Sequence, residues 1–261
     1  MPKFAANLTF LFNEAPFLDR FALSRKAGFK GVEYMFPYAE NKAELATRLK
    51  DNGLTQVLFN LPGGDWAGGE RGIAILPDRK EEFRRGVHQA IEYAGALSCD
   101  QVNCLAGLAA QGADPKALRA TFVENLAYAA AEMKKAGVKL LIEAINPRDI
   151  PGFYLNRTAQ AASLIDDVGS DNLYIQYDIY HMQITEGDLT RTIDANLKRI
   201  AHIQLADNPG RNEPGSGEIN FPFLFQHIDK LGYSGWIGCE YKPLTTTAAG
   251  LGWIAPYQSA Q

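Results

Sequence analysis

Short apolar runs alternate with longer amphipathic segments along the whole chain. The apolar runs have the length of buried strands. Eight of them occur, at residues 4–10, 31–36, 55–60, 100–106, 138–144, 173–178, 200–206 and 236–241. The segments between them have helical patterns, clearest over residues 16–29, 77–97, 115–136 and 221–233. The pattern therefore predicts strands and helices in alternation.

Glycines stand where the predicted helices end. Gly28, Gly53, Gly137 and Gly232 suit the left-handed conformation that often closes a helix. Eight strand–helix units fit a closed barrel better than an open doubly wound sheet, which usually has fewer strands. No GxGxxG motif follows the first run, which counts against a dinucleotide-binding sheet. We therefore predict an α/β fold, a (β/α)₈ TIM barrel that forms a single domain over residues 1–261.

Composition and charge narrow the classes of partner. With 46% hydrophobic and 21% charged residues, the chain is typical of a globular protein with a large core. The net charge of -4 gives no basic surface for nucleic acid, and no apolar run reaches the roughly 20 residues of a membrane helix. Cys99, Cys104 and Cys239 lack the spacing of a zinc site or a disulfide framework. Because the N-terminus also lacks a signal-peptide pattern, we expect a cytoplasmic protein with reduced cysteines.

Four consecutive predicted strands end in a side chain that can bind a metal ion. These residues are Glu143, Asp178, Gln204 and Glu240. In a barrel, the C-terminal strand ends meet at one mouth, and alternation along each strand decides which side chains point inward. If this face is inward, four oxygen donors converge, a set that suits Mg²⁺ or Mn²⁺ better than zinc. A bound dication would also offset the cost of burying the Glu240 carboxylate.

A single acid at a strand end has an ordinary explanation. It is more often a salt-bridge partner or a helix cap than a metal ligand. Four metal-capable residues on successive strands, at equivalent heights, are much harder to explain by coincidence. The spacing therefore favours a joint metal site over four unrelated groups.

Further polar residues lie close to the predicted mouth. His181 follows Asp178 by three positions, and Arg211 and Glu218 lie in the Gly- and Pro-rich loop 206–221. The planar guanidinium of Arg211 suits a substrate carboxylate, whereas Glu218 could orient a ligand or cap the next helix. A structural histidine and solvated loop charges are the alternative explanations.

A second Gly-rich loop, residues 59–72, follows the third predicted strand. It lacks the GK[ST] of a phosphate-binding loop, so we interpret it as a lid over the mouth. Trp66 in this loop would close over a substrate or pack against the base of the lid. Asn60, at the strand end, is a further and weaker candidate for substrate binding.

The chain as a whole resembles the hydroxypyruvate isomerase family, within the xylose isomerase-like barrel superfamily that includes ketose 3-epimerases. The resemblance runs nearly end to end and is most specific in LLIEAIN, IQYDIYHMQ, ADNPGRNEPGSGEINF and WIGCEYKPLTTTAAGLGW. It implies a divalent-metal site on Glu143, Asp178, Gln204 and Glu240. It also implies that the substrate is a small keto or hydroxy acid.

The resemblance further implies roles for individual residues. Glu143 and Glu240 would serve as the acid–base pair, and His181 and Arg211 match positions that face the substrate in the related epimerases. Those epimerases usually have histidine where this chain has Gln204. Glutamine fits the hydroxypyruvate isomerase branch, and we expect it to weaken metal affinity or to shift the preference toward harder cations.

The implied reaction interconverts hydroxypyruvate and 2-hydroxy-3-oxopropanoate (tartronate semialdehyde). One glutamate would remove a proton from the hydroxymethyl carbon, and the same or the opposite glutamate would return one to the neighbouring carbon. A metal ion would stabilise the enediolate between these two steps. No electrons leave the substrate, so we expect no organic cofactor.

Other functions stay open. A 2-oxo-tetronate isomerase would use the same chemistry on a four-carbon acid, and a ketose 3-epimerase would act on a larger neutral sugar, although Arg211 argues for an acidic substrate. A phosphodiesterase related to the apurinic-site endonucleases would need more histidines than four and a basic groove. A non-catalytic ligand-binding barrel, and assembly into a homo-oligomer, are also compatible with the sequence.

Overall fold

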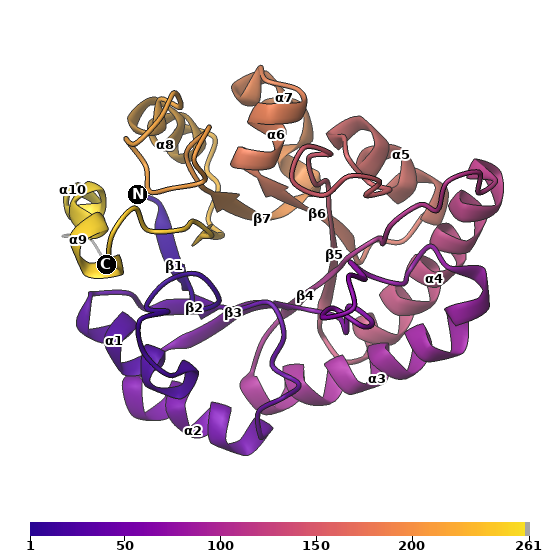
Figure 1. The fold of residues 1–261 in the computed structure, drawn as a ribbon, viewed down its shortest axis with the longest axis horizontal. Helices are drawn as coiled ribbons and strands as arrows, with labels where there is room; N and C mark the ends of the chain where they lie inside the picture. Colours follow the sequence, from indigo (N-terminus) through magenta and orange to yellow (C-terminus); the bar gives the residue numbers. More distant parts are fainter. Residues whose placement is uncertain (259–261) are drawn as a thin grey trace.

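Eight parallel strands close into a barrel at the centre of the molecule (Figure 1). The computed structural model describes residues 1–258. Each strand pairs with its neighbours in chain order, and β1 pairs with β8 to complete the ring. The strands are β1 Lys3–Asn7, β2 Gly31–Glu33, β3 Thr55–Asn60, β4 Gln101–Cys104, β5 Lys139–Glu143, β6 Leu173–Asp178, β7 Ile200–Leu205 and β8 Trp236–Cys239. The predicted TIM barrel and its eight strands are confirmed.

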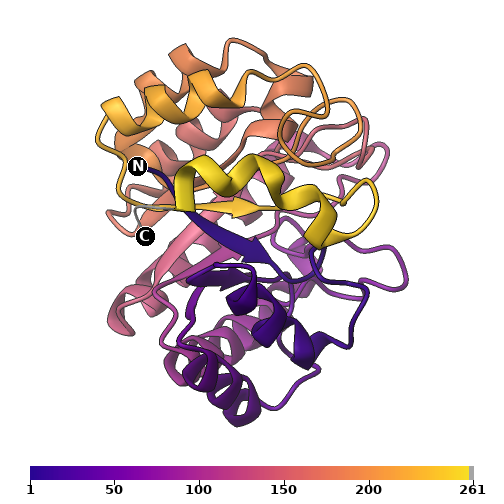
Figure 2. The same cartoon turned by 90° about the vertical axis from the view of Figure 1, so that its left-hand side faces the viewer.

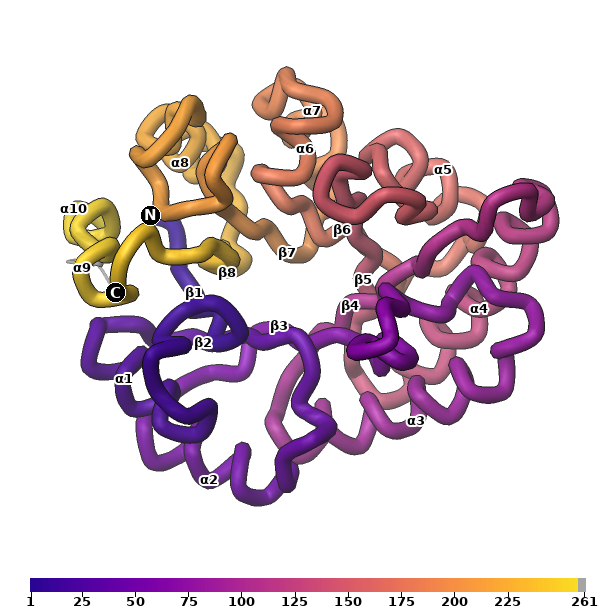
Figure 3. The backbone as a smooth tube through the Cα atoms, in the orientation of Figure 1, coloured from indigo at the N-terminus to yellow at the C-terminus, as the bar shows by residue number. Residues whose placement is uncertain are grey.

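Helices cover the outside of the barrel and return the chain from one strand to the next (Figure 3). The helices are α1 Arg20–Lys26, α2 Lys42–Asn52, α3 Lys80–Leu97, α4 Pro115–Lys135, α5 Thr158–Val168, α6 Ile179–Thr185, α7 Leu189–Asn196, α8 Phe221–Lys230, α9 Thr247–Gly250 and α10 Ala255–Gln258, with 3₁₀ turns η1 Phe17–Asp19, η2 Pro77–Arg79, η3 Leu197–Arg199 and η4 Leu251–Ile254. Gly53 directly follows α2 with a φ of 58°, the left-handed cap that the sequence predicts. Within residues 1–258, no helix is long and apolar enough to cross a membrane.

The last helices pack beside the strand that begins the chain (Figure 2). Phe4 of β1 makes edge contacts with the rings of Phe225, Trp253 and Tyr257, at centroid distances of 5.1, 5.1 and 5.7 Å. Buried aromatic pairs of this geometry add about 0.5–1.5 kcal/mol each beyond their area. The cluster therefore fastens the C-terminal segment to the seam where β8 meets β1.

The inside of the barrel is apolar at one level and polar at the next. Ala5, Val57 and Leu141 belong to a small buried apolar cluster. Because β1, β3 and β5 are not neighbours, these side chains meet inside the barrel. Asn7 and Glu143 stand two positions after Ala5 and Leu141, so alternation points them into the same interior. The polar level lies at the C-terminal strand ends, where the sequence predicts the site.

Six of the eight strands end one to three residues earlier than predicted, and two of these ends bear on the position of Glu240 and Asn7. β8 ends at Cys239, one residue before Glu240, whose N–H donates to the carbonyl of Leu205 (3.1 Å). β1 ends at Asn7, because its Oδ1 accepts the N–H of Thr9 and turns the chain. Glu240 therefore lies just beyond the end of β8.

The three cysteines are buried free thiols. Burial raises the pKa of Cys99 to about 12 and also raises the pKa values of Cys104 and Cys239. Since the thiolate is the reactive form, we expect the native protein to show no fast reaction with DTNB at pH 8. The protein unfolded in guanidinium should titrate all three thiols. A thiol that reacts within minutes in the native state would contradict this burial.

Candidate active site

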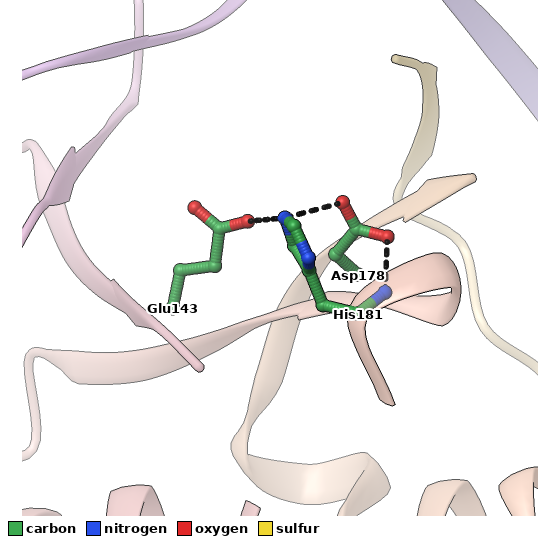
Figure 4. A group of neighbouring side chains, drawn as sticks. All are labelled: Glu143, Asp178 and His181. Carbon is green, nitrogen blue, oxygen red and sulfur yellow. Dashed lines mark hydrogen bonds and ion pairs between the residues drawn. The ribbon is translucent and has the colours of Figure 1, made fainter. Parts of the chain in front are cut away.

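The ends of β5 and β6 bring Glu143, Asp178 and His181 to one point (Figure 4). Glu143 and Asp178 are the last residues of their strands, and His181 lies in the first turn of α6. The Nε2 atom of His181 lies 3.6 Å from Oδ2 of Asp178 and 3.9 Å from Oε1 of Glu143. All three side chains are buried. They form a candidate site for a cation or a small polar ligand.

Asp178 caps α6, and this fixes the direction of its second oxygen. Oδ1 accepts the backbone N–H groups of Tyr180 (2.7 Å) and His181 (3.3 Å), as in an N-cap. Oδ2 is buried and has no hydrogen-bond partner among residues 1–258. Because buried polar atoms are nearly always paired, this oxygen fits a bound cation or a donor group from a ligand.

Glu240 receives donors on both of its oxygens. Oε2 accepts from the side-chain amides of Asn7 (3.0 Å) and Gln204 (2.7 Å), and Oε1 accepts from Nη2 of Arg211 (2.6 Å). Two amides thus engage Oε2, whereas Oε1 has a single protein donor in these contacts. Oε1 is therefore the oxygen that a ligand can share.

Glu33, the last residue of β2, is a buried acid that the sequence interpretation missed. Its Oε1 accepts from Asn7 (3.0 Å) and Gln204 (2.8 Å), the same amides that hold Glu240. Its Oε2 lies 2.7 Å from Nε2 of His202. The two glutamates are therefore joined by two bridging amides, which fixes Glu240 from inside the barrel.

The side chain of Glu33 fits inside the barrel because the residue facing it on β8, Gly238, has no side chain. A Cβ atom on Gly238 would lie 2.3 Å from the oxygens of Glu33, closer than real contacts allow. A signal for Glu33 was present in the sequence, because it is an acid within the apolar run 31–36. The same pattern singled out Glu240 within the run 236–241.

The amide of Gln204 has a defined orientation. Its nitrogen faces the carboxylates of Glu33 and Glu240, and its oxygen accepts Nε2–H of Gln176 (2.6 Å). The reversed amide would set an oxygen against two carboxylates, so the chemistry excludes it. This oxygen has a second lone pair, with which it could bind a cation while it keeps the Gln176 donor. The predicted role of Gln204 as a metal ligand stays a prediction.

Arg211 brings a guanidinium into the site. Its Cζ lies 5.3 Å and 5.1 Å from the ring centroids of Phe10 and Tyr180. Nη2 lies 3.9 Å from Oδ2 of Asp178, and Nε is buried without a hydrogen-bond partner in the part of the chain that the structure describes. The guanidinium therefore keeps a donor free in the wall of the site, and its predicted contact with a substrate stays a prediction.

Asn60 and Trp66 also line the cavity over the cluster. Oδ1 of Asn60 accepts from Asn103, whose amide also donates to Oε2 of Glu143 (3.2 Å). Trp66 lines the cavity and packs edge-on against Phe36, which lies between β2 and α2, at a centroid distance of 4.9 Å. Their contact with a substrate stays a prediction.

Glu218 lies apart from the other candidates. Its side chain is exposed, and Oε1 accepts from Asn208 (2.5 Å) and Gln183 (3.2 Å). It does not appear in the lining of the cavity. These contacts favour a structural role in the loop 206–221, and its predicted substrate contact stays a prediction.

The cavity has a volume of about 110 Å³ and a mixed lining. Its polar part consists of Asn60, Glu143, Gln176, His181, Arg211 and Glu240, and its apolar part consists of Phe10, Met35, Trp66, Leu105, Ile145 and Ile150. Small-molecule sites commonly combine apolar walls with a few convergent polar groups. The lining therefore suits a small molecule that carries several oxygen atoms.

Burial and mutual repulsion disturb the titration of the cluster. Burial raises the pKa of Glu143 well above its usual range, with repulsion from Glu240 adding to it, and burial also raises the pKa of Asp178. Burial raises the pKa of Glu240 to about 8 although Arg211 opposes the shift. Burial and the nearby Arg211 lower the pKa of His181 well below its usual value, so its ring is neutral at pH 7. One guanidinium does not neutralise three carboxylates, so the cluster favours bound protons or a further cation.

Known proteins resemble this chain over almost all of its length. Residues 21–257 match the xylose isomerase-like TIM barrel family. Hydroxypyruvate isomerase of Escherichia coli (strain K12) is 55% identical over 258 residues, which cover 99% of this chain and 100% of that protein. The 2-oxo-tetronate isomerase of Cupriavidus necator is 51% identical over 257 residues, 98% of this chain and 99% of that protein.

Solved structures share the fold. A crystal structure described as AP endonuclease, family 2, from Brucella melitensis has a TM-score of 0.97 and 47% identity, over 98% of this chain and 99% of that one. L-ribulose 3-epimerase, at 24% identity and a TM-score of 0.77, covers 98% of this chain and 86% of its own and shares the fold alone. The chain belongs to the xylose isomerase-like TIM barrel family, as an isomerase related to the two curated enzymes.

Proposed function

We propose that this enzyme interconverts hydroxypyruvate and 2-hydroxy-3-oxopropanoate by moving a proton between adjacent carbons. The observation that carries the proposal is a small cavity lined by Glu143, Glu240 and Arg211, with Asp178 just behind this lining, 3.9 Å from Nη2 of Arg211. A proton shift beside a carbonyl needs a base, an acid and positive charge near the oxygens. The 55% identity to the E. coli hydroxypyruvate isomerase supports the choice of substrate.

A divalent cation, Mg²⁺ or Mn²⁺, belongs to this proposal. Glu143, Asp178, Gln204 and Glu240 would hold it through oxygen atoms, which such hard cations prefer. The unpartnered, buried Oδ2 of Asp178 and the excess of carboxyls over guanidinium support this fit. When bound, the cation would polarise the substrate carbonyl and offset the negative charge that develops on its oxygens.

The two glutamates each keep one oxygen for proton transfer. Oε2 of Glu240 is held by two amides and Oε2 of Glu143 by Asn103, whereas Oε1 of Glu240 accepts from the guanidinium of Arg211. One Oε1 would take a proton from the hydroxymethyl carbon, and the other would deliver one to the neighbouring carbon. The proton of the C3 hydroxyl would pass to the former carbonyl oxygen at C2, so that C3 becomes the aldehyde and C2 carries the hydroxyl. Arg211, whose Nε–H lacks a partner, would hold the substrate carboxylate and so decide which carbon meets which glutamate.

A four-carbon substrate is the second candidate. The relative from Cupriavidus necator is a 2-oxo-tetronate isomerase at 51% identity, so sequence identity separates the two substrates only weakly. Arg211 would serve either acid, since both carry a carboxylate. A comparison of kcat/KM for the three- and four-carbon acids decides between them, and we expect the three-carbon acid to be preferred.

A nuclease activity is not favoured, although the Brucella melitensis structure carries such a description. Of the four histidines, His88 and His227 lie on the outer helices α3 and α8, where they contact Tyr128 and Asp194. His202 faces Glu33 inside the barrel, so His181 alone of the four stands at the mouth. With a net charge of -4 as well, the chain lacks the charge that attracts a phosphate backbone.

The test is incubation with hydroxypyruvate in deuterated water, followed by NMR of substrate and product. We expect conversion to 2-hydroxy-3-oxopropanoate with deuterium at its C2, because a carboxyl proton exchanges with solvent between removal and delivery. A chelator should stop both conversion and labelling, and added Mg²⁺ or Mn²⁺ should restore them.

The outcomes of this experiment separate the parts of the proposal. Conversion without any label would point to a hydride shift or a fully shielded proton and would contradict exchangeable carboxyls. Conversion that survives exhaustive chelation would contradict the cation. Absence of conversion of both acids would overturn the proposed function.

A further inference from the structure

We infer that Asn146 fixes the tautomer of His181, so that the ring presents an Nε2–H donor to the cavity. Asn146 is fully buried and lies three residues after Glu143, in the connection between β5 and α5. The tautomer follows from hydrogen-bond chemistry alone. Its use in binding a substrate oxygen rests on the proposed function.

The side-chain amide of Asn146 has a fixed orientation. Its Oδ1 accepts the backbone N–H of Asp149 at 2.8 Å. A backbone N–H can only donate, so the oxygen must lie on this side. The reversed amide would set two donors against each other at hydrogen-bond distance. The NH₂ group of Asn146 therefore points the other way.

That NH₂ group meets His181. The Nδ2 atom of Asn146 lies 2.7 Å from Nδ1 of His181. An amide NH₂ only donates, so Nδ1 must accept and carries no proton. A neutral imidazole has one N–H, and which nitrogen carries it is set by the hydrogen bond that the other nitrogen makes. The proton of His181 therefore lies on Nε2.

One contact argues for the opposite tautomer, and its length decides against it. Nη2 of Arg211 lies 3.5 Å from Nε2 of His181, and a hydrogen bond there would require Nε2 to accept. This distance is outside the usual range for an N–H donor, whereas the two contacts of Asn146, at 2.7 and 2.8 Å, are within it. The pair of shorter contacts determines the tautomer.

The Nε2–H group is then a buried donor without an acceptor among the described residues, 1–258. The nearest carboxylate oxygens, on Asp178 and Glu143, lie 3.6 and 3.9 Å away, beyond hydrogen-bond reach. His181 lines the cavity, so an oxygen of a bound substrate can fill the vacant place. With its proton on Nε2, the ring does not act as a metal ligand through that atom, although it lies beside two candidate ligands. Asn146 is a positioning residue that acts through His181.

The first test reads the tautomer directly. Long-range ¹H–¹⁵N spectra of the ¹⁵N-histidine-labelled protein at pH 7, without metal and with Mg²⁺, distinguish Nε2–H, Nδ1–H and imidazolium rings. The signals of His181 are those missing in the His181→Gln variant. We expect the neutral Nε2–H form in both samples. An Nδ1–H ring or an imidazolium in the metal-free wild type would overturn the inference.

The second test changes the positioning residue. In Asn146→Asp a carboxylate can accept from both Asp149 N–H and Nδ1–H, so Nδ1 should gain a proton and kcat/KM for hydroxypyruvate should fall about 10- to 100-fold. Asn156→Asp makes the same charge change in the same connection, where Asn156 donates to a backbone carbonyl, and should stay within about twofold of wild type.

Tautomer and rate together separate the two claims. If the ring of His181 in Asn146→Asp still carries its proton on Nε2 and none on Nδ1, Asn146 does not determine the tautomer and its positioning role is overturned. A normal rate with a changed ring would overturn the substrate contact of His181. A wild type with the expected tautomer but no turnover of hydroxypyruvate would refute the proposed function and leave the tautomer standing.

Discussion

Replacing Glu240 by Gln is expected to lower kcat for hydroxypyruvate by about 10³-fold or more, while the barrel stays folded. An amide at this place cannot take a proton from carbon or return one. Gln has the same shape as Glu, and its carbonyl oxygen can still accept from Asn7 and Gln204. The new NH₂ would then face the guanidinium of Arg211, which loses its 2.6 Å partner and must shift. The substitution therefore removes the proton-transferring group and changes the local charge. It leaves no cavity in the core, because the two side chains have the same shape.

The matched control is Glu81→Gln, an exposed acid on α3 that pairs with Arg84. It makes the same chemical change far from the mouth and should keep kcat within about twofold, since exposed ion pairs contribute little. Steady-state kinetics with circular dichroism and thermal unfolding of both variants make the comparison. If Glu240→Gln retained near-normal turnover, Glu240 would have no part in the proton transfer.

The barrel and the three clustered acids could be predicted because they depend on local pattern and on a general rule of topology. Each acid follows an apolar run, and parallel strands all end at the same edge. Glu143 and Asp178 are the last residues of β5 and β6, and Glu240 comes one residue after β8. The alternation of residues along each strand indicates which side chains point into the barrel. Together with the common edge, this is enough to predict that the three acids lie close together.

The hydrogen-bond partners within the site could not be predicted. The alternation of residues along a strand indicates which face a side chain occupies, but not which distant segment it contacts. Asn7 and Glu240 are 233 positions apart in the chain, and Gln204 and Glu33 are 171 apart. Whether an amide offers its oxygen or its nitrogen depends on these partners. The oxygen of Gln204, predicted as a ligand, accepts from Gln176 for this reason.

The candidate residues in the loop 206–221 were predicted from the composition of the loop, which does not determine where each side chain lies. Arg211 and Glu218 come from the same Gly- and Pro-rich loop, yet Arg211 lies in the cavity wall and Glu218 outside it. The guanidinium of Arg211 packs near two rings, those of Phe10 and Tyr180, at 5.3 and 5.1 Å. The sequence of the loop does not indicate these ring contacts, because Phe10 lies near the start of the chain and Tyr180 lies on α6.

The titration of the cluster links cation binding, stability and pH. In the folded protein the pKa of Glu240 is about 8 and that of Glu143 is well above its usual value, mainly because of burial, whereas an unfolded glutamate titrates near 4.5. Between these values the folded state binds more protons than the unfolded state. The free energy of unfolding of the cation-free protein therefore falls as pH rises through this window.

Removing the cation should therefore lower the stability of the folded protein most at the upper end of this pH range. A carboxyl with a folded pKa of about 8 should lower the free energy of unfolding by about 2 kcal/mol between pH 6 and pH 8. Because 1 kcal/mol corresponds to about 2–4 °C for a chain of this size, we expect Tm in excess chelator to fall by about 5 °C over this range. A cation displaces the carboxyl protons, so its affinity rises with pH, and saturating Mg²⁺ should raise Tm more at pH 8 than at pH 6. Thermal unfolding at both pH values, with Glu240→Gln as the control that lacks one of the titrating groups, measures the slope. A cation-induced shift equal at both pH values would mean that these carboxyls carry no protons for the cation to displace.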